Sequence, residues 1–428
     1  MGLQPAHHQR QHISTIMTGI FSKRGAQPRG WSIAAIAFTG GVGGGVVFPI
    51  LPVLGIDLGI PAYMVGLILS ANRLTRLGFN PVTGSLIDRF GARWPVAAGL
   101  CVEALGTLAF SIALTSHRPS LWFLAGRIVW GVGSSLLLVG TLAAVMSIAP
   151  LERRGSMVAR VRTAISLGLP AGLLIGGLIA DRFSANAAFL TATALTIVGA
   201  AASVYVLPSR ARREPAVPAN PASTAALPLE TVNWRTLLHI PDLRMIWSAN
   251  ALLFFAMSGV LLATLAVMVQ KRALDIFGMQ AEGSAGLYMA VMMVARAVTA
   301  LASGHLLDRS RSRTSLLLPA VLMVAGGFMI LGSAAHVGTV VLGLLLVGAG
   351  SGALTIPLLT LLSDVTPHHL YGRALSVYQW SSDFGGAAGP IAGLELGQAF
   401  GYDLVYVAVG AILLVMALPL RALIARHR

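Results

Sequence analysis

Long apolar stretches, separated by short polar segments, recur from residue 31 almost to the end of the chain. Each lasts about twenty residues, which is enough to cross a hydrocarbon core of about 30 Å as an α-helix. A transmembrane β-strand needs only about ten residues and alternates apolar with polar positions. The stretches lie near residues 31–55, 62–83, 95–116, 121–148, 157–181, 187–207, 243–270, 284–305, 314–335, 338–363, 372–397 and 401–422. The pattern predicts an all-α polytopic membrane protein with twelve spanning helices.

A polar stretch, PSRARREPAVPANPASTAALPLE at residues 208–230, separates the first six apolar stretches from the last six. Its composition, rich in Pro, Ala and Arg, cannot bury a hydrophobic core. It therefore predicts a cytoplasmic linker between two halves. The predicted segments are an N-terminal tail 1–30, a first six-helix half 31–207, the linker 208–242, a second six-helix half 243–422 and a C-terminal tail 423–428.

The composition indicates that lipid covers much of the surface. Of the 428 residues, 56% are hydrophobic and only 11% are charged, whereas soluble domains carry about 25% charged residues. The net charge of +15 does not indicate a nucleic-acid partner, because the basic residues lie in short clusters between the apolar stretches. That distribution is the positive-inside pattern of a membrane protein. The single cysteine, Cys101, excludes an intrachain disulfide.

The arginine clusters also predict the orientation in the membrane. If the N-terminus is cytoplasmic, the cytoplasmic connections and tail hold Arg89, Arg93, Arg153, Arg154, Arg210, Arg212, Arg213, Arg309, Arg311, Arg313, Arg421, Arg426 and Arg428. The opposite connections then hold Arg118, Arg182, Lys271 and Arg272. Because cytoplasmic connections carry the excess of Lys and Arg, both termini are predicted to be cytoplasmic. The expected location is a bacterial-type inner membrane, or an internal membrane derived from it.

The two halves of the chain resemble each other. Residues 62–93 shifted by 220 positions match residues 282–313 at Gly66/Gly286, Leu67/Leu287, Arg76/Arg296, Gly84/Gly304, Leu86/Leu306, Asp88/Asp308, Arg89/Arg309 and Arg93/Arg313. A second block, at an offset of 217, matches at Gly131/Gly348, Gly133/Gly350, Pro150/Pro367, Gly155/Gly372, Gly172/Gly389 and Gly176/Gly393. A duplicated six-helix unit is typical of transporters built from two pseudo-symmetric halves.

The stretch GSLIDRFGAR, residues 84–93, resembles the connection between helices 2 and 3 of the major facilitator superfamily. The family pattern G-x-L-x-D-R-x-G-x-R is matched by Gly84, Leu86, Asp88, Arg89, Gly91 and Arg93. GHLLDRSRSR at 304–313 is similar to the weaker copy between helices 8 and 9, with Arg311 in place of the glycine. The resemblance covers residues 31–422 and implies a twelve-helix secondary transporter.

Glycines in other helices add to the resemblance. RIVWGVGSS, residues 127–135, is similar to the family's R-x-x-x-G-x-G pattern, and helix 11 has the glycine–proline motif of antiporters. In helix 5, Leu173 stands where that motif has proline, which weakens an antiporter assignment. Small residues let membrane helices approach closely. The predicted helix-packing residues are Gly131, Gly133, Gly172, Gly176, Gly389, Pro390 and Gly393.

The repeated connecting motif also has a physical interpretation. Gly84 permits close approach of two helices, and Asp88 can accept hydrogen bonds from a neighbouring helix N-terminus. Such contacts break when the halves rock, so they bias the equilibrium between inward and outward states. The alternative is that this basic loop only sets the topology. The predicted conformational latch comprises Gly84, Asp88, Arg89, Gly91, Arg93, Gly304, Asp308, Arg309 and Arg313.

Arginines within the predicted spans are candidates for substrate binding. A charge at the centre of a lone helix costs about 2.5–3.5 kcal/mol on insertion scales, so it normally faces a cavity or a partner. Arg76 and Arg296 occupy equivalent positions of the repeat and predict an anion site between the halves. Arg127 is a further candidate substrate-binding residue. The alternative is that these arginines link neighbouring helices. Arg73 is matched by Met293 in the repeat and has no assigned role.

Acidic residues within spans are candidates for proton coupling, since a proton-coupled carrier needs a buried carboxyl that binds and releases protons. Asp383 in helix 11 is the first candidate and Glu103 in helix 3 the second. Helix 1, where many proton-coupled drug exporters of the family keep an acid, has none in this chain. Whether transport is coupled to protons is left open.

The sequence predicts a secondary transporter that moves a small solute by alternating access, with export of an organic or anionic solute as the first hypothesis. Met289, Met292 and Met293, together with the histidines of residues 7–12, raise a second hypothesis. In it the cargo is a metal ion such as iron, or a metal chelate or siderophore. The third is a non-transporting receptor or scaffold on the same fold. Neither catalysis nor a cofactor is predicted, and the oligomeric state is left open.

Overall fold

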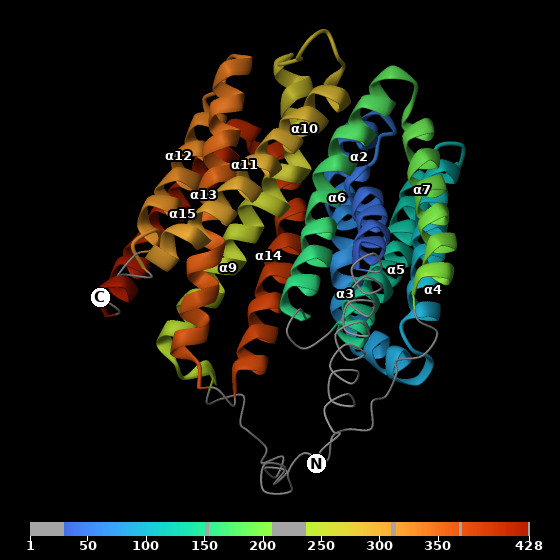
Figure 1. Ribbon diagram of the computed structural model, residues 1–428. Helices are drawn as coiled ribbons and strands as arrows, with labels where there is room; N and C mark the ends of the chain where they lie inside the picture. Colours follow the sequence, from blue (N-terminus) through green and yellow to red (C-terminus); the bar gives the residue numbers. More distant parts are fainter. Residues whose placement is uncertain (1–29, 150–153, 208–236, 310–313, 368–369, 427–428) are drawn as a thin grey trace, which may run out of the picture.

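The structure, a computed structural model, describes residues 30–149, 154–207, 237–309, 314–367 and 370–426. Long helices fill these ranges and lie side by side as an elongated bundle (Figure 1). The hydrocarbon core of a membrane holds no water to bond backbone N–H and C=O groups. A helix is favoured there because it forms these hydrogen bonds within a single segment. The predicted all-α membrane fold is confirmed.

The described residues up to 207 form six helical segments. The first is the span Gly30–Asp57, whose second part is α2 (Val47–Asp57). The others are α3 (Ala62–Phe90), α4 (Arg93–Ala113), α5 (Pro119–Ile148), α6 (Arg154–Arg182) and α7 (Ala185–Val206). Helix α5 packs against α3 and α4, and α4 also packs against α7.

Six further segments follow residue 240. The first, Pro241–Arg272, runs continuously through α9 (Pro241–Phe254), the π-helical η2 (Phe255–Leu261) and α10 (Leu262–Arg272). The others are α11 (Ala281–Arg309), α12 (Leu317–Gly332), α13 (Val337–Val365), α14 (Tyr371–Phe400) and α15 (Tyr402–Arg426). Helix α13 packs against α11 and α12, in the same way that α5 packs against α3 and α4.

Two boundaries differ from those expected from the sequence. Helix α9 begins at Pro241, within the predicted linker, because proline is well suited to the first turn of a helix. Helix α15 continues past residue 422 to Arg426, and Leu423 is fully buried, so these residues extend the span rather than start a tail. Residues 1–29 of the predicted tail and 208–236 of the predicted linker lie outside the described residues, and the remaining predicted bounds of the segments stay predictions.

The repeated glycines lie at equivalent helix contacts. A side chain at Gly131 would meet Asn72 of α3, and a side chain at Gly348 would meet Met292 of α11. Further equivalent contacts are made by Gly133 and Gly350, against α4 and α12, and by Gly172 and Gly389, against the first span and η2. Because only a hydrogen occupies each contact, the helices approach more closely than larger residues would allow.

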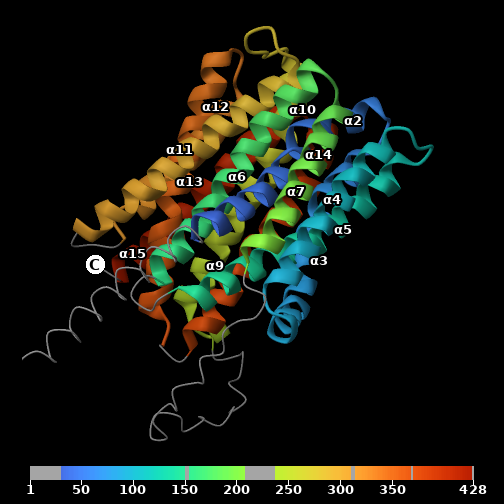
Figure 2. The ribbon, with the colours of Figure 1, turned by 45° about the vertical axis from the view of Figure 1, so that its right-hand side comes forward.

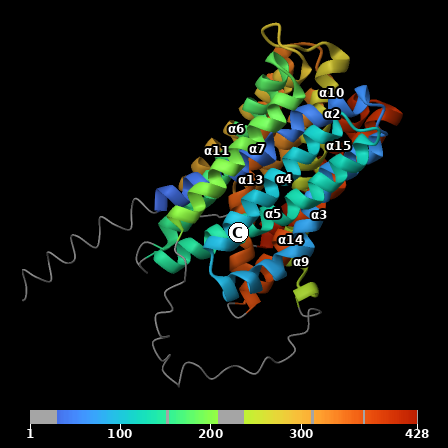
Figure 3. The same cartoon turned by 90° about the vertical axis from the view of Figure 1, so that its right-hand side faces the viewer.

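The first six segments meet the last six mainly through four pairs of helices: α3 with α14, α6 with α11, α2 with α10, and α2 with α11. Figures 2 and 3 show α6 close to α11 and α3 close to α14. We name the two ends of the bundle by their connections. The motif end contains residues 90–93, between α3 and α4, and the opposite end contains residues 57–62, between α2 and α3. Gly66 packs on Pro390, and Gly177 on Gly286, both toward the opposite end.

Candidate functional site

An ion pair joins the two parts of the chain where α3 packs on α14. Nη2 of Arg76 lies 2.5 Å from Oδ1 of Asp383. The Arg76 side chain is 19% exposed and the Asp383 side chain 4% exposed, so this pair is shielded from solvent far more than an ordinary surface salt bridge. Nε2 of Gln379, one turn away on α14, donates to the other carboxylate oxygen at 3.4 Å. The candidate substrate residue and the candidate proton residue are therefore partners.

Arg73 lies one turn from this pair, in the same interface. Its guanidinium occupies the space beside Gly386 of α14, where a side chain larger than hydrogen would collide with it. The charges of Arg76, Asp383 and Arg296 all act on Arg73. Arg76 and Arg73 thus lie near one carboxylate, and Arg296 is close enough to Arg73 to repel it, which leaves an excess of positive charge between the two parts of the chain.

Arg296 approaches this region from α11 but has no carboxylate partner among the described residues. Its Nη1 lies 3.4 Å from the sulfur of Met257, and its guanidinium lies over the Phe254 ring, 5.3 Å from the ring centre. Both neighbours belong to the segment where α9 changes into η2. π-Helical turns of this kind are frequent at functional sites.

Two buried polar atoms near Arg296 also lack hydrogen-bond partners within the described ranges. They are the hydroxyl of Tyr378, on α14, and Oδ1 of Asn250, on α9. The amide nitrogen of Asn250 is bonded to the backbone oxygen of Tyr378 at 2.8 Å, so α9 and α14 are joined at this level. Buried polar atoms are normally paired. A ligand acceptor would take hydrogen bonds from Tyr378 and Arg296, whereas Oδ1 of Asn250 needs a donor.

Arg127 is fully buried and donates to α3 rather than facing the charged interface. Its Nη2 donates to the Asn72 side chain at 2.9 Å and to the Leu69 carbonyl at 3.1 Å. Its guanidinium also lies 5.7 Å from the ring centre of Phe48 in α2. This placement favours the interpretation in which the arginine links helices.

Glu103 of α4 lies inside the first six-helix group, apart from Asp383. It is fully buried, and neither carboxylate oxygen has a hydrogen-bond partner in the described part of the chain. A side chain at Gly40 of the first span, or at Gly133 of α5, would collide with it. The two candidate proton sites thus differ: Asp383 is paired with an arginine, whereas Glu103 is enclosed by close helix packing.

Among the described residues of the predicted latch, Arg93 contacts a distant part of the chain. The close helix approach predicted at Gly84 is wrong, because open space surrounds that glycine. Asp88 and Arg89 are exposed, and the Arg89 guanidinium lies 5.2 Å from the Phe90 ring centre. Nε of Arg93 donates to the Leu207 carbonyl at 2.6 Å, which caps the end of α7. Gly91 ends α3 with φ +76°, a conformation that glycine adopts without strain. The side chains of Asp308 and Arg309, and all of Arg313, lie outside what the structure describes.

The described residues contain no cluster of three or more His, Cys, Asp or Glu side chains arranged to hold a metal ion. Met289 and Met292 are buried in α11, whereas His305 is exposed. The histidines of residues 7–12 and the pair at 368–369 lie outside the described ranges. The part of the chain that is described therefore offers nothing in favour of a metal as cargo.

The sequence profile of the Major Facilitator Superfamily matches residues 33–390 and 279–428. The chain belongs to this superfamily. Solved structures of the superfamily fold superimpose on it along almost its whole length. A mutant of the nucleoside transporter NupG gives a TM-score of 0.76 at 12% identity, covering 92% of this chain and 99% of NupG. A bacterial homologue of the human lysosomal transporter Spinster, in an inward-facing and occupied conformation, gives a TM-score of 0.76 at 13% identity. The match covers 93% of this chain and 96% of the homologue.

Relatives in sequence are also superfamily transporters. The efflux pump PmrA of Streptococcus pneumoniae is 26% identical over 374 residues, 85% of this chain and 88% of the pump. The synaptic vesicular amine transporter of Mus musculus is 24% identical over 414 residues, which are 94% of this chain and 74% of the mouse protein. Multidrug resistance protein 2 of Bacillus subtilis is 28% identical over 170 residues, and that alignment spans only 41% of the Bacillus protein. The fold and the transporter class are thereby established.

Proposed function

We propose that this transporter exports a small organic anion, which binds between the two six-helix halves. The observation that carries the proposal is the excess of arginine over carboxylate at this interface: Arg76 is paired with Asp383, whereas Arg73 and Arg296 have no carboxylate in contact among the described residues. A site with this charge excess favours an anion, since a cation would meet three guanidinium groups. Among the relatives, PmrA is named as a multidrug efflux pump, which supports the direction of transport.

Arg296 is the proposed anchor for the anion. Arg76 already has Asp383 as its partner, whereas Arg296 has an aromatic ring and a sulfur beside it. The adjacent Tyr378 hydroxyl can donate a further hydrogen bond. The apolar surface of Phe254 and Met257 then suits the organic part of the solute. Hydrogen bonds between charged groups contribute about 1.5–3 kcal/mol each.

Asp383 is the proposed site of proton coupling. While the carboxylate is charged, it binds Arg76 and holds α14 against α3. Protonation removes that attraction and frees Arg76, so the interface between the halves can open. In the next state, loss of the proton restores the pair. We propose that these proton steps alternate with binding of the solute, so that one solute is exchanged for a proton.

The test uses two probes that differ in the sign of a permanent charge, benzenesulfonate and phenyltrimethylammonium. Proteoliposomes that are acidic inside should accumulate benzenesulfonate, because an exchanger moves solute toward the acidic side. Arg296→Gln should raise the benzenesulfonate concentration that gives half-maximal transport by about tenfold or more, because one hydrogen bond from a charged group is lost. Asp383→Asn should abolish the dependence on the pH gradient. Arg118→Gln, an exposed residue of the opposite end, is the matched control and should behave as the wild type.

Three results would contradict the proposal. Accumulation of phenyltrimethylammonium, but not benzenesulfonate, would assign a cationic solute to Asp383, as the kinship with an amine transporter allows. Accumulation in vesicles that are acidic outside would indicate uptake with protons instead of export. If Arg296→Gln does not change the benzenesulfonate concentration for half-maximal transport, Arg296 does not bind the solute and only links helices.

A further inference from the structure

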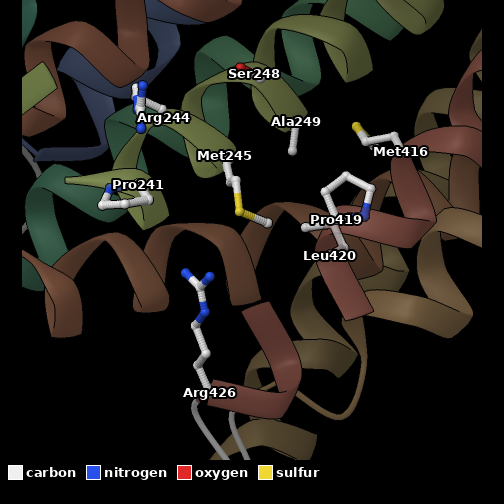
Figure 4. Close-up of a pocket in the computed structure, with 9 residues that line it drawn as sticks. All are labelled: Pro241, Arg244, Met245, Ser248, Ala249, Met416, Pro419, Leu420 and Arg426. Carbon is white, nitrogen blue, oxygen red and sulfur yellow. The ribbon is translucent and has the colours of Figure 1, made fainter. Parts of the chain in front are cut away.

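A pocket of about 470 Å³ lies at the motif end, between the start of α9 and the end of α15. Its lining shares no residue with the charged interface around Asp383. Figure 4 shows Arg426 extending from the end of α15 toward Met245 of α9, with Pro419 across from it. The pocket therefore lies where two spanning helices reach the membrane boundary, on the outside of the second half.

The lining changes from cationic to apolar along both helices. Arg244 lies near the start of α9 and Arg426 at the end of α15, so both arginines are at the rim. Leu420 and Met416 lie about 9 Å and about 15 Å further along α15. Pro419 lies between them inside the helix, where it removes one backbone donor. The pocket thus offers positive charge at the boundary and apolar contact deeper in the bilayer.

The charge at the rim is positive on balance. Nη1 of Arg426 lies 2.9 Å from Oδ1 of Asp242, which positions its guanidinium across the pocket. Arg244 is exposed, and the described residues provide no ion-pair partner for it. The N-terminus of α9 adds a partial positive charge at the same place. An anionic group is therefore attracted to this rim.

We propose that this pocket binds an anionic phospholipid such as phosphatidylglycerol. The phosphate lies between Arg244 and Arg426, and one acyl chain follows Leu420 and Met416 into the bilayer. A free anion would use only the rim and leave the apolar wall uncovered. A zwitterionic lipid would bring its own cation to the unpaired Arg244. Basic pockets between membrane helices are known to recognise anionic head groups.

The experiment measures lipid binding to the purified full-length chain in detergent, so it does not depend on the transported solute. Phosphatidylglycerol and phosphatidylcholine are added separately, and phosphatidylglycerol is also added together with an excess of inorganic phosphate. Retained lipid is counted by native mass spectrometry and the unfolding temperature is recorded. Phosphatidylglycerol should bind most strongly and raise the unfolding temperature. Loss of each arginine, in Arg244→Gln and Arg426→Gln, should weaken binding about fivefold, in line with the effect of one basic residue at an anionic surface.

Two further variants separate the head group from the chain. Ser248→Trp fills the exposed wall of the pocket and keeps both arginines, so it should also weaken phosphatidylglycerol binding. Arg421→Gln removes an exposed arginine of α15 that does not line the pocket, and it should have no effect. Equal binding of phosphatidylcholine, full competition by inorganic phosphate, or an equal loss in Arg421→Gln would each overturn the proposal.

Discussion

At the scale of single residues, the structure separates charges that form pairs from charges that do not. Arg76 and Asp383 are 307 positions apart in the chain, and their pairing depends on how the two halves face each other. No local sequence pattern shows which residues of the two halves meet. The sequence therefore predicted Arg76 and Asp383 as separate candidates and gave Arg73 no role. The structure explains Arg73 by the space beside Gly386. The sequence contained no signal for this contact, because it does not give the register of α3 against α14.

Glu103 gives a prediction at this scale. Its two carboxylate oxygens are buried without partners among the described residues, and burial of an unpaired polar group costs about 1–3 kcal/mol in proteins. Glu103→Met should therefore raise the free energy of unfolding by a similar amount. The equivalent position of the second half is Val324, which is fully buried against Gly350. Val324→Glu should lower the free energy of unfolding.

Reversible unfolding in detergent measures both variants, with circular dichroism as the readout. If Glu103→Met is less stable than the wild type, the carboxyl has a partner, such as an internal water, and the residue supports the fold. If the variant is more stable but no longer responds to a pH gradient in proteoliposomes, the carboxyl contributes to proton coupling instead.

At the scale of helices, the sequence predicted the spans well because about twenty apolar residues in succession have few alternatives to a membrane helix. The packing glycines were also predictable, since the repeat marks them in both halves. The π-helical segment Phe255–Leu261 was not predicted. It differs from the α-helix around it by one extra residue in a turn, and its sequence FAMSGVL contains no proline. Gly259 of this segment packs closely on Gly389 of α14.

Gly389→Leu tests this contact. A Cβ atom at residue 389 would lie 2.5 Å from the Cα of Gly259 and 2.5 Å from the backbone oxygen of Phe255, so α14 and η2 must separate. Overpacking of this kind costs about 1–3 kcal/mol. The variant should unfold at a lower temperature in detergent, and its transport should fall because Asp383 moves with α14. Gly372→Leu on the same helix is the control, since open space surrounds that position. Equal stability of the two variants would contradict the assigned contact.

At the scale of the whole molecule, the described contacts between the halves gather toward the opposite end. Oδ1 of Asp181, in α6, accepts a hydrogen bond of 2.5 Å from the backbone N–H of Gln280, just before α11. Gly177 and Gly286 bring the same two helices together one turn further in. The exposed latch residues Asp88 and Arg89 lie at the motif end. Alternating access then requires the opposite-end contacts to break while motif-end contacts form.

Asp181→Ala should shift this equilibrium. The side chain of Asp181 is only 5% exposed and bridges the two halves, so its loss removes a charge-assisted hydrogen bond worth about 1.5–3 kcal/mol from the closed state. The accessibility of residue 70 measures this shift, because Ser70 is fully buried and bonded to the backbone oxygen of Ala387 in α14. In a Cys101→Ser background, the thiol of Ser70→Cys should react with a membrane-impermeant reagent faster, by about tenfold or more, when Asp181→Ala is added. Asp275→Ala, an exposed carboxylate of the same end, should leave that rate unchanged. The same rate in all three proteins would mean that Asp181 does not hold the opposite end closed, and that α3 and α14 alone determine the closure.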